Sequence, residues 1–226
     1  MSETTTNPPK GKPCTHHPQL RYKAQTYICV VSLAVLIVCG GCRNPWMENI
    51  LINLYHIGDK GPGGGIVFYR SAKGFTDTYS GKTHYFLEAA PVDMPADMPG
   101  PLQWANFSNV TGATGTAIGT GRANTKVVID FVNAYSGNCP AVYECYNYRN
   151  SGKTDWFLPS KNELNQLWHN RKAVNDAGGN LIINDNYWSS SENDSNTAWF
   201  QDFDTGVQLF GTTKTGGAYV RPIRSF

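Results

Sequence analysis

The sequence lacks a strong charge of either sign and a long hydrophobic run, and each lack excludes a class of function. The 226 residues carry 19 Lys and Arg against 17 Asp and Glu. Four of these basic residues and one acidic residue lie in 1–41, which leaves 15 basic and 16 acidic residues for 42–226. A chain with a net charge near −1 offers no electrostatic footprint for nucleic acid. The apolar run at 27–41 is about 15 residues long, whereas a membrane span needs about 20.

The short apolar run has the pattern of an export signal. It follows Arg21 and Lys23 and ends in small residues, as secretory signals do. The next residues, Val38-Cys39-Gly40-Gly41-Cys42, resemble a relaxed bacterial lipobox with Cys39 where Leu is usual. The resemblance implies a lipoprotein signal peptide at 1–41, a lipidated Cys42, and an exported protein anchored in the outer membrane at the cell surface. An uncleaved N-terminal anchor is the alternative.

Only two cysteines, Cys139 and Cys145, lie downstream of Cys42. Two remaining thiols in an exported protein predict a disulfide that closes a small loop, and two free cysteines are the alternative. No histidine lies near them, so the sequence predicts no metal site there. No cofactor is expected either.

The first part of the chain is predicted to consist of a tether, two strands and a long loop. Residues 42–56 form the tether, and the folded domain is predicted to cover 57–226. Glycines at 58–65 precede a strand, whereas a phosphate-binding loop follows a strand and opens a helix, so we interpret them as a turn. A second strand is expected at 83–91. The loop at 91–121 should be packed down by Trp104 and Ile118.

Two helices are predicted from periodicity and capping. Residues 124–135 are amphipathic, and Ser160 with Glu163 forms a capping box that starts a second helix. The expected buried side chains are Val127, Val128, Phe131 and Val132 in the first helix and Leu164, Leu167 and Trp168 in the second.

The last forty residues contain a hairpin pattern. Ala198–Asp204 and Val207–Thr213 flank Thr205-Gly206, a pair suited to a tight turn that would set Phe203 opposite Gln208 and Asp202 opposite Leu209. Beyond the hairpin, 219–224 alternates apolar and cationic residues as a half-buried strand does. Alternation in the first strand places Trp199, Gln201 and Phe203 toward the core. The other face mixes residue types that no packing rule selects, and an ordinary exposed sheet face is the alternative; it carries Phe200, Asp202, Asp204, Val207, Leu209 and Gly211.

Three motifs in order, GDKGPGGGIVFY (58–69), DWFLPSKNEL (155–164) and YWSSSE…VRPIR (187–224), resemble a family of bacterial surface domains. The resemblance covers about 57–226. It implies an α+β, C-type-lectin-like fold with mixed or antiparallel sheets, two helices and long loops.

The lipobox and the hairpin together resemble the Treponema variable lipoproteins, which a diversity-generating retroelement rewrites near the 3′ end of the gene. These belong to the C-type-lectin-like subclass that resembles formylglycine-generating enzymes. The resemblance implies a variable ligand-binding region at about 184–220. Its scaffold positions would be Trp188, Ser189, Ser190, Ser191, Glu192, Trp199, Phe203, Gly206, Val220, Arg221, Ile223 and Arg224. Its variable, ligand-binding positions would be Asn193, Asp194, Asn196, Thr197, Phe200, Asp202, Val207, Leu209, Phe210, Gly211, Thr213 and Thr215.

The resemblance implies a binding protein whose ligand is a protein or a glycan on another cell or host. The lipid would make the membrane a second partner. Nucleic acid is not expected as a partner. An invariant surface adhesin or sugar-binding module is the alternative.

Catalysis and calcium binding have weaker support in the sequence. Formylglycine-generating oxidases use cysteines in a copper site, but no cysteine follows Cys145. A catalytic set of Ser189–Ser191, His169 and Asp185 is conceivable, but serine runs in strands are usually structural, so we expect no enzyme. Asp202–Gly206 starts like a calcium loop, yet the twelfth position is Thr213 rather than Glu.

Overall fold

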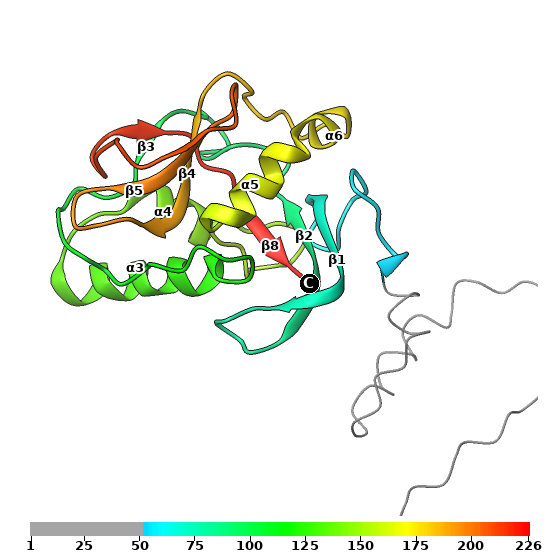
Figure 1. Ribbon diagram of the computed structural model, residues 1–226, viewed down its shortest axis with the longest axis horizontal. Helices are drawn as coiled ribbons and strands as arrows, with labels where there is room; N and C mark the ends of the chain where they lie inside the picture. The colour runs from blue at the N-terminus through cyan, green and yellow to red at the C-terminus, as the bar shows by residue number, and fades with distance from the viewer. Residues whose placement is uncertain (1–51) are drawn as a thin grey trace, which may run out of the picture. The chain divides into compact units, whose positions relative to one another are not determined.

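The computed structural model describes residues 52–226, so the predicted signal peptide, the lipid site at Cys42 and most of the tether lie outside the described residues. The described chain is α+β (Figure 1). Two helices were predicted, and the structure has four over this range. The elements in chain order are β1 (Ile66–Thr76), β2 (Thr83–Ala89), β3 (Leu102–Gln103), α3 (Gly121–Tyr135), α4 (Pro140–Asn147), α5 (Lys161–His169), α6 (Arg171–Asp176), β4 (Asn186–Glu192), β5 (Ala198–Asp202), β6 (Gln208–Leu209), β7 (Gly217–Ala218) and β8 (Ile223–Ser225). Over the same range, no helix combines the length and the apolar character that a membrane crossing needs.

Three small antiparallel sheets organise the domain, in the orders β1-β2-β8, β3-β7 and β4-β5-β6. In Figure 1, β8 at the C-terminal end lies beside β2, far from it in sequence. Phe226 extends this pairing, because its N–H donates to the Phe86 carbonyl at 3.1 Å and its carbonyl accepts from Tyr85 at 2.9 Å. The last residues of the chain therefore complete the first sheet.

The glycine-rich segment before β1 is a turn, as predicted, and it holds an anion of the protein itself. The N–H groups of Gly63 and Gly65 donate to the carboxylate of Glu88 on β2 at 2.9 to 3.1 Å. Arg224 donates to the same carboxylate at 2.9 Å. A Cβ at Gly63 would lie 2.6 Å from Glu88, so a side chain there has no room. The glycines thus serve an internal carboxylate.

Side chains upstream of Ile57 also belong to the packed domain. Ile52 is buried with Phe86, and the Tyr55 ring contacts the rings of Phe86 and Phe226 edge-on at 5.4 and 5.2 Å. The folded region therefore includes residues that were assigned to the tether.

Helix α5 begins as the capping box predicts, whereas α3 is rotated from its prediction. The Ser160 N–H donates to the Glu163 carboxylate at 2.7 Å, and the Ser160 hydroxyl accepts from the Glu163 N–H. In α3, Val127 is 37% exposed and Phe131 is only half-buried. The helix turns polar side chains inward instead, because these bond to buried backbone; its buried residues are Gly121, Asn124, Thr125, Val128, Ile129 and Val132.

The predicted disulfide is wrong in this structure, where Cys139 and Cys145 are free and buried. Cys139 caps the start of α4, and Cys145 lies within that helix. The five helical steps from Pro140 to Cys145 rise about 7.5 Å at 1.5 Å each. Disulfides need Cα atoms within about 7 Å, so the helix holds the two thiols apart.

The loop between β2 and α3 is anchored as predicted. The Trp104 side chain is fully buried, and its Nε1 donates to the Ser189 carbonyl at 2.8 Å. Ile118 is partly buried and packs against a second core cluster, which contains Phe157. The anchored loop is hydrogen-bonded to the C-terminal region, because Ala105 N–H donates to the Lys214 carbonyl at 3.1 Å and Glu192 N–H donates to the Ala113 carbonyl at 2.8 Å.

Candidate ligand-binding face

The C-terminal hairpin has shorter strands and a longer turn than predicted. Phe200 pairs with Leu209 and Gln201 with Gln208, so the register differs by two residues from the expected one. The Asp202 carboxylate closes the turn by accepting from Asp204 N–H at 2.8 Å and from the Thr205 hydroxyl at 2.8 Å. That hydroxyl bond, the largest contribution, lowers the pKa of Asp202 below its usual value. The calcium-like start of this segment is therefore an aspartate-capped turn.

The predicted core face is correct for Gln201 of β5 and for Phe203, the residue after β5. Both are fully buried, and each is hydrogen-bonded to a side chain of α5. Trp199, on the same face, lies at the rim and is only half-buried, with Lys161 Nζ 3.3 Å from its ring centre and Phe210 at 4.9 Å. The prediction that Phe200 faces outward is wrong. Phe200 is 7% exposed because its ring packs edge-on against Trp188 at 5.7 Å.

The other candidate positions reach the surface. Asp202 and Thr197 are half-buried. Among the apolar ones, Val207, Leu209 and Phe210 are 50%, 42% and 49% exposed. The remaining candidates are all exposed: Asn193, Asp194, Asn196, Gly211, Thr213 and Thr215. We call Val207, Leu209 and Phe210 with Trp199 the apolar part of the face, and Asn193–Thr197 with Thr213–Thr215 the polar part.

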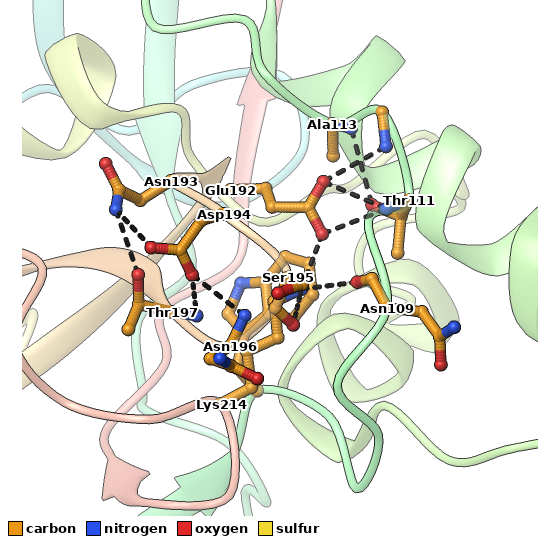
Figure 2. Close-up of polar contacts among 12 residues, drawn as sticks. Asn109, Thr111, Ala113, Glu192, Asn193, Asp194, Ser195, Asn196, Thr197 and Lys214 are labelled. Atoms are coloured by element: carbon orange, nitrogen blue, oxygen red, sulfur yellow. Dashed lines mark hydrogen bonds and ion pairs between the residues drawn. The ribbon is translucent and has the colours of Figure 1, made fainter.

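A buried ion pair lies beneath the polar part (Figure 2). Lys214 Nζ lies 2.5 Å from the Glu192 carboxylate, and both side chains are 1% exposed. The ammonium also donates to the carbonyls of Asn109 at 2.7 Å and Ser195 at 3.0 Å. Glu192 in turn accepts the Thr111 N–H at 2.9 Å. This Glu192–Lys214 clasp joins the 109–113 loop, the 193–197 turn and the 212–216 segment.

The polar tip above the clasp is ordered by its own short-range bonds. One Asp194 oxygen accepts from the N–H groups of Asn196 and Thr197, both at 2.8 Å (Figure 2). These bonds lower the pKa of Asp194, and the Asn196 N–H makes the largest contribution. The Lys214 N–H donates to the Asn196 carbonyl at 2.8 Å, which ties the tip to the neighbouring segment. The tip therefore presents its side chains from a fixed backbone.

The sequence analysis did not predict that Lys214 is buried in an ion pair. It lies in a Thr/Gly-rich stretch, where a single lysine is normally solvated, and its partner Glu192 is 22 residues upstream. The 109–113 loop carries no pattern that places it under the hairpin. A lone lysine flanked by small polar residues was the only available signal.

The cationic residues of 219–224 are buried, whereas a half-buried strand was predicted there. Arg221 is fully buried and pairs with Asp93 at 2.6 Å. Its guanidinium also donates to the carbonyls of Ala90 and Gly179, both at 2.6 Å. Burial raises the pKa of Asp93, against the opposing effect of Arg221. The arginines are therefore structural anchors for the strand that follows the hairpin.

The serine run of β4 is engaged with backbone. Ser189 Oγ donates to the Trp199 carbonyl at 2.8 Å, and Ser191 Oγ donates to the Gly115 carbonyl at 2.6 Å. His169 is exposed at the end of α5. Between residues 52 and 226, no three His, Cys, Asp or Glu side chains are grouped as a metal ion requires.

The fold and this face define an α+β domain that carries an exposed C-terminal hairpin on a buried polar base. Residues 95–224, more than half of the chain, match the Lcl C-terminal domain. The chain belongs to the Lcl C-terminal domain family.

The other comparisons bear on the fold alone. A solved fimbrial protein from Bacteroides ovatus is similar, with 13% identity and a TM-score of 0.50. The match covers 74% of this chain and 45% of that one, so this chain spans less than half of the fimbrial protein. The comparison with curated proteins gave no match.

Proposed function

We propose that this protein is an exported lipoprotein, anchored in the outer membrane through Cys42, that binds an external ligand at the cell surface. The ligand, a protein or a glycan, contacts the exposed side chains of the C-terminal hairpin. Membership of the Lcl C-terminal domain family and the likeness to a fimbrial protein support an adhesin-like role. We also propose that this domain has the C-type-lectin-like fold of the bacterial surface domains that its three motifs resemble.

The Glu192–Lys214 clasp is the observation that carries the proposal. It fixes three loops from below, while the side chains above it have no structural task beyond the tip's local bonds. A preformed surface avoids part of the ordering cost of binding. Exposed substitutions away from special features change stability by less than about 0.5 kcal/mol, so such a face can vary without loss of the fold.

Binding is tested by placing a charge within the apolar part of the face. The double variant Leu209→Asp/Phe210→Asp, displayed on cells, should lose adhesion to host cells while its thermal unfolding is unchanged. Ile183→Asp is the matched control, because Ile183 is also apolar and 52% exposed but lies outside the hairpin. Equal adhesion by the unmodified chain, the double variant and Ile183→Asp would contradict this site.

Diversification by a retroelement is the finer part of the proposal. Sequencing the 3′ end of the gene across a population should show changes confined to the exposed candidates, at adenine positions of a near-copy elsewhere in the genome. Phe200 should stay apolar, since it is buried against Trp188. A uniform sequence without a near-copy would rule diversification out.

The second candidate is an invariant adhesin with one partner. The apolar part of the face favours it, because exposed apolar side chains that lie together mark interaction sites, and Phe210 lies against the Trp199 ring there. Either way we propose binding rather than catalysis, since backbone groups already engage the hydroxyls of Ser189 and Ser191.

A further inference from the structure

A separate cavity of about 240 Å³ lies between α3, α4 and the 154–157 segment, and no candidate position of the hairpin lines it. We call it the α3–α4 cavity. Its walls combine two kinds of side chain. Arg122, Lys126 and Arg149 bring positive charge, and Tyr79, Tyr146 and Trp156 bring aromatic rings.

The charges of the cavity leave one cation unmatched. Arg122 pairs with Asp77 at 3.2 Å, and Lys126 pairs with Asp130 on its own helix. The acidic wall residue Asp155 is matched by Arg224 at 2.6 Å.

Arg149 is the unmatched cation. Its Nη1 donates to the carbonyls of Tyr146 and Tyr148, both at 2.8 Å. Among residues 52–226 no carboxylate lies within ion-pair distance of it. The guanidinium is thus held in place through one nitrogen, while its other N–H groups remain as donors. A planar guanidinium with two donors in a row matches one carboxylate.

Trp156, another residue of the cavity wall, also has an unmatched donor. The Trp156 side chain is 2% exposed, and its Nε1 has no acceptor within the described protein. Buried indole N–H groups usually find a partner, so this one needs an acceptor from elsewhere. The aromatic walls around it favour a flat body over a long flexible one.

We propose that the α3–α4 cavity binds a small ligand in which one carboxylate is attached to a flat ring. The single unmatched charge selects a monoanion. Arg149 takes the carboxylate, and Tyr79 and Tyr146 flank the ring. The volume fits this size, because a cavity of about 150 Å³ is enough to bind benzene and this one measures about 240 Å³. The site is independent of the hairpin face.

Three probes separate the parts of this ligand. Benzoate has the ring and the charge, acetate has the charge alone, and benzyl alcohol has the ring alone. Calorimetry on the purified full-length chain, at constant ionic strength, should show saturable binding of benzoate to one site. Acetate and benzyl alcohol should bind at least about tenfold more weakly, since each lacks one set of contacts.

Variants then assign the contacts. Arg149→Gln should weaken benzoate binding at least about tenfold, and Arg149→Lys should recover only part of it, because a lysine cannot form the two-pronged contact. Arg171→Gln is the matched control, since Arg171 also donates to a carbonyl, that of Trp168, but lies on α6. Thermal unfolding of each variant confirms that it is folded.

An NMR measurement locates the ring. Trp156→Phe removes one indole N–H signal and so identifies it, and benzoate should shift that signal in the unmodified chain. Benzoate binding that is unchanged in Arg149→Gln, acetate binding as tight as benzoate, or an unmoved Trp156 signal at saturation would each overturn the proposal. The absence of saturable binding in the millimolar range would do the same.

Discussion

At the scale of single residues, the most consequential side chain is a lysine with no distinguishing sequence context. Lys214 neutralises Glu192 where neither reaches water, and removing one partner of such a pair leaves a buried charge without compensation. Its ammonium also lies 5.0 Å from the centre of the Trp104 ring, so the clasp touches the anchor of the long loop.

Lys214→Met should therefore destabilise the domain by about 3–5 kcal/mol, measured as the free energy of unfolding in urea. Lys172→Met is the control, because Lys172 pairs with Asp176 where both side chains are mostly exposed, and such pairs contribute less than about 1 kcal/mol. The double variant Glu192→Gln/Lys214→Met should recover part of the loss, because no charge is then left buried. Equal effects of both lysine variants would contradict the clasp.

Glu163 gives the domain a pH-dependent stability. Burial raises the pKa of this carboxyl to about 7, against the opposing effect of the N–H groups of Ser160 and Gly119. The folded state then binds a proton that the unfolded state, with its lower pKa, releases. Its stabilising contribution is full below the unfolded pKa of about 4.5 and is lost as pH rises through about 7.

We expect the contribution of Glu163 to the free energy of unfolding to fall by at most roughly 1.4 kcal/mol per pH unit between pH 5 and 7. Glu163→Gln cannot titrate, so its unfolding free energy should fall less over this interval than that of the unmodified chain. Urea unfolding at a series of pH values measures the difference. Parallel curves for the two chains would show that Glu163 has an ordinary pKa.

At the scale of elements, two glycines of the hairpin differ in whether their surroundings leave room for a side chain. Gly206 has φ +82°, and a Cβ there would lie 2.2 Å from the Trp168 ring of α5. Gly211 is exposed, and nothing lies within 4 Å of the Cβ position. The two positions are five residues apart in the same hairpin, so they form a matched pair.

Gly206→Ala should lower the free energy of unfolding by more than about 1 kcal/mol, because it adds both backbone strain and overlap. Gly211→Ala should change it by less than about 0.5 kcal/mol. Thermal unfolding of the two variants beside the unmodified chain gives the comparison. A large effect at Gly211 would remove it from the tolerant positions.

Elements with a local chemical signal were predictable, and those defined by distant contacts were not. The capping box placed the start of α5, and the glycine turn before β1 follows from its order in the chain. The short helices α4 and α6 have local signals at one end, Pro140 at the start of α4 and Gly178 after α6, but eight and six residues are too few for a periodic pattern that would predict a helix. The face assignment of Phe200 failed because β4 and β5 are covered on both sides, and strand alternation cannot distinguish a covered second face from an exposed one.

At the scale of the whole molecule, the buried thiols predict a domain that does not depend on oxidation. Burial raises the pKa of Cys139 to about 12 and that of Cys145 well above its usual value, so neither is a reactive thiolate. The melting temperature should be the same with and without a reductant. Alkylation should modify the peptide with both cysteines only after unfolding, as detected by mass spectrometry. A lower melting temperature in reductant would instead indicate a disulfide.

The position of β8 has a consequence for how the protein is made. Without β8 and the residues just before it, Glu88 lacks Arg224, Asp93 lacks Arg221, and β2 has an unpaired edge. A chain cut short by a stop codon within the hairpin never receives these partners and leaves two buried carboxylates uncompensated. A frameshift within the hairpin would remove the same partners, so we expect a folded domain only when the hairpin is translated in frame through to β8.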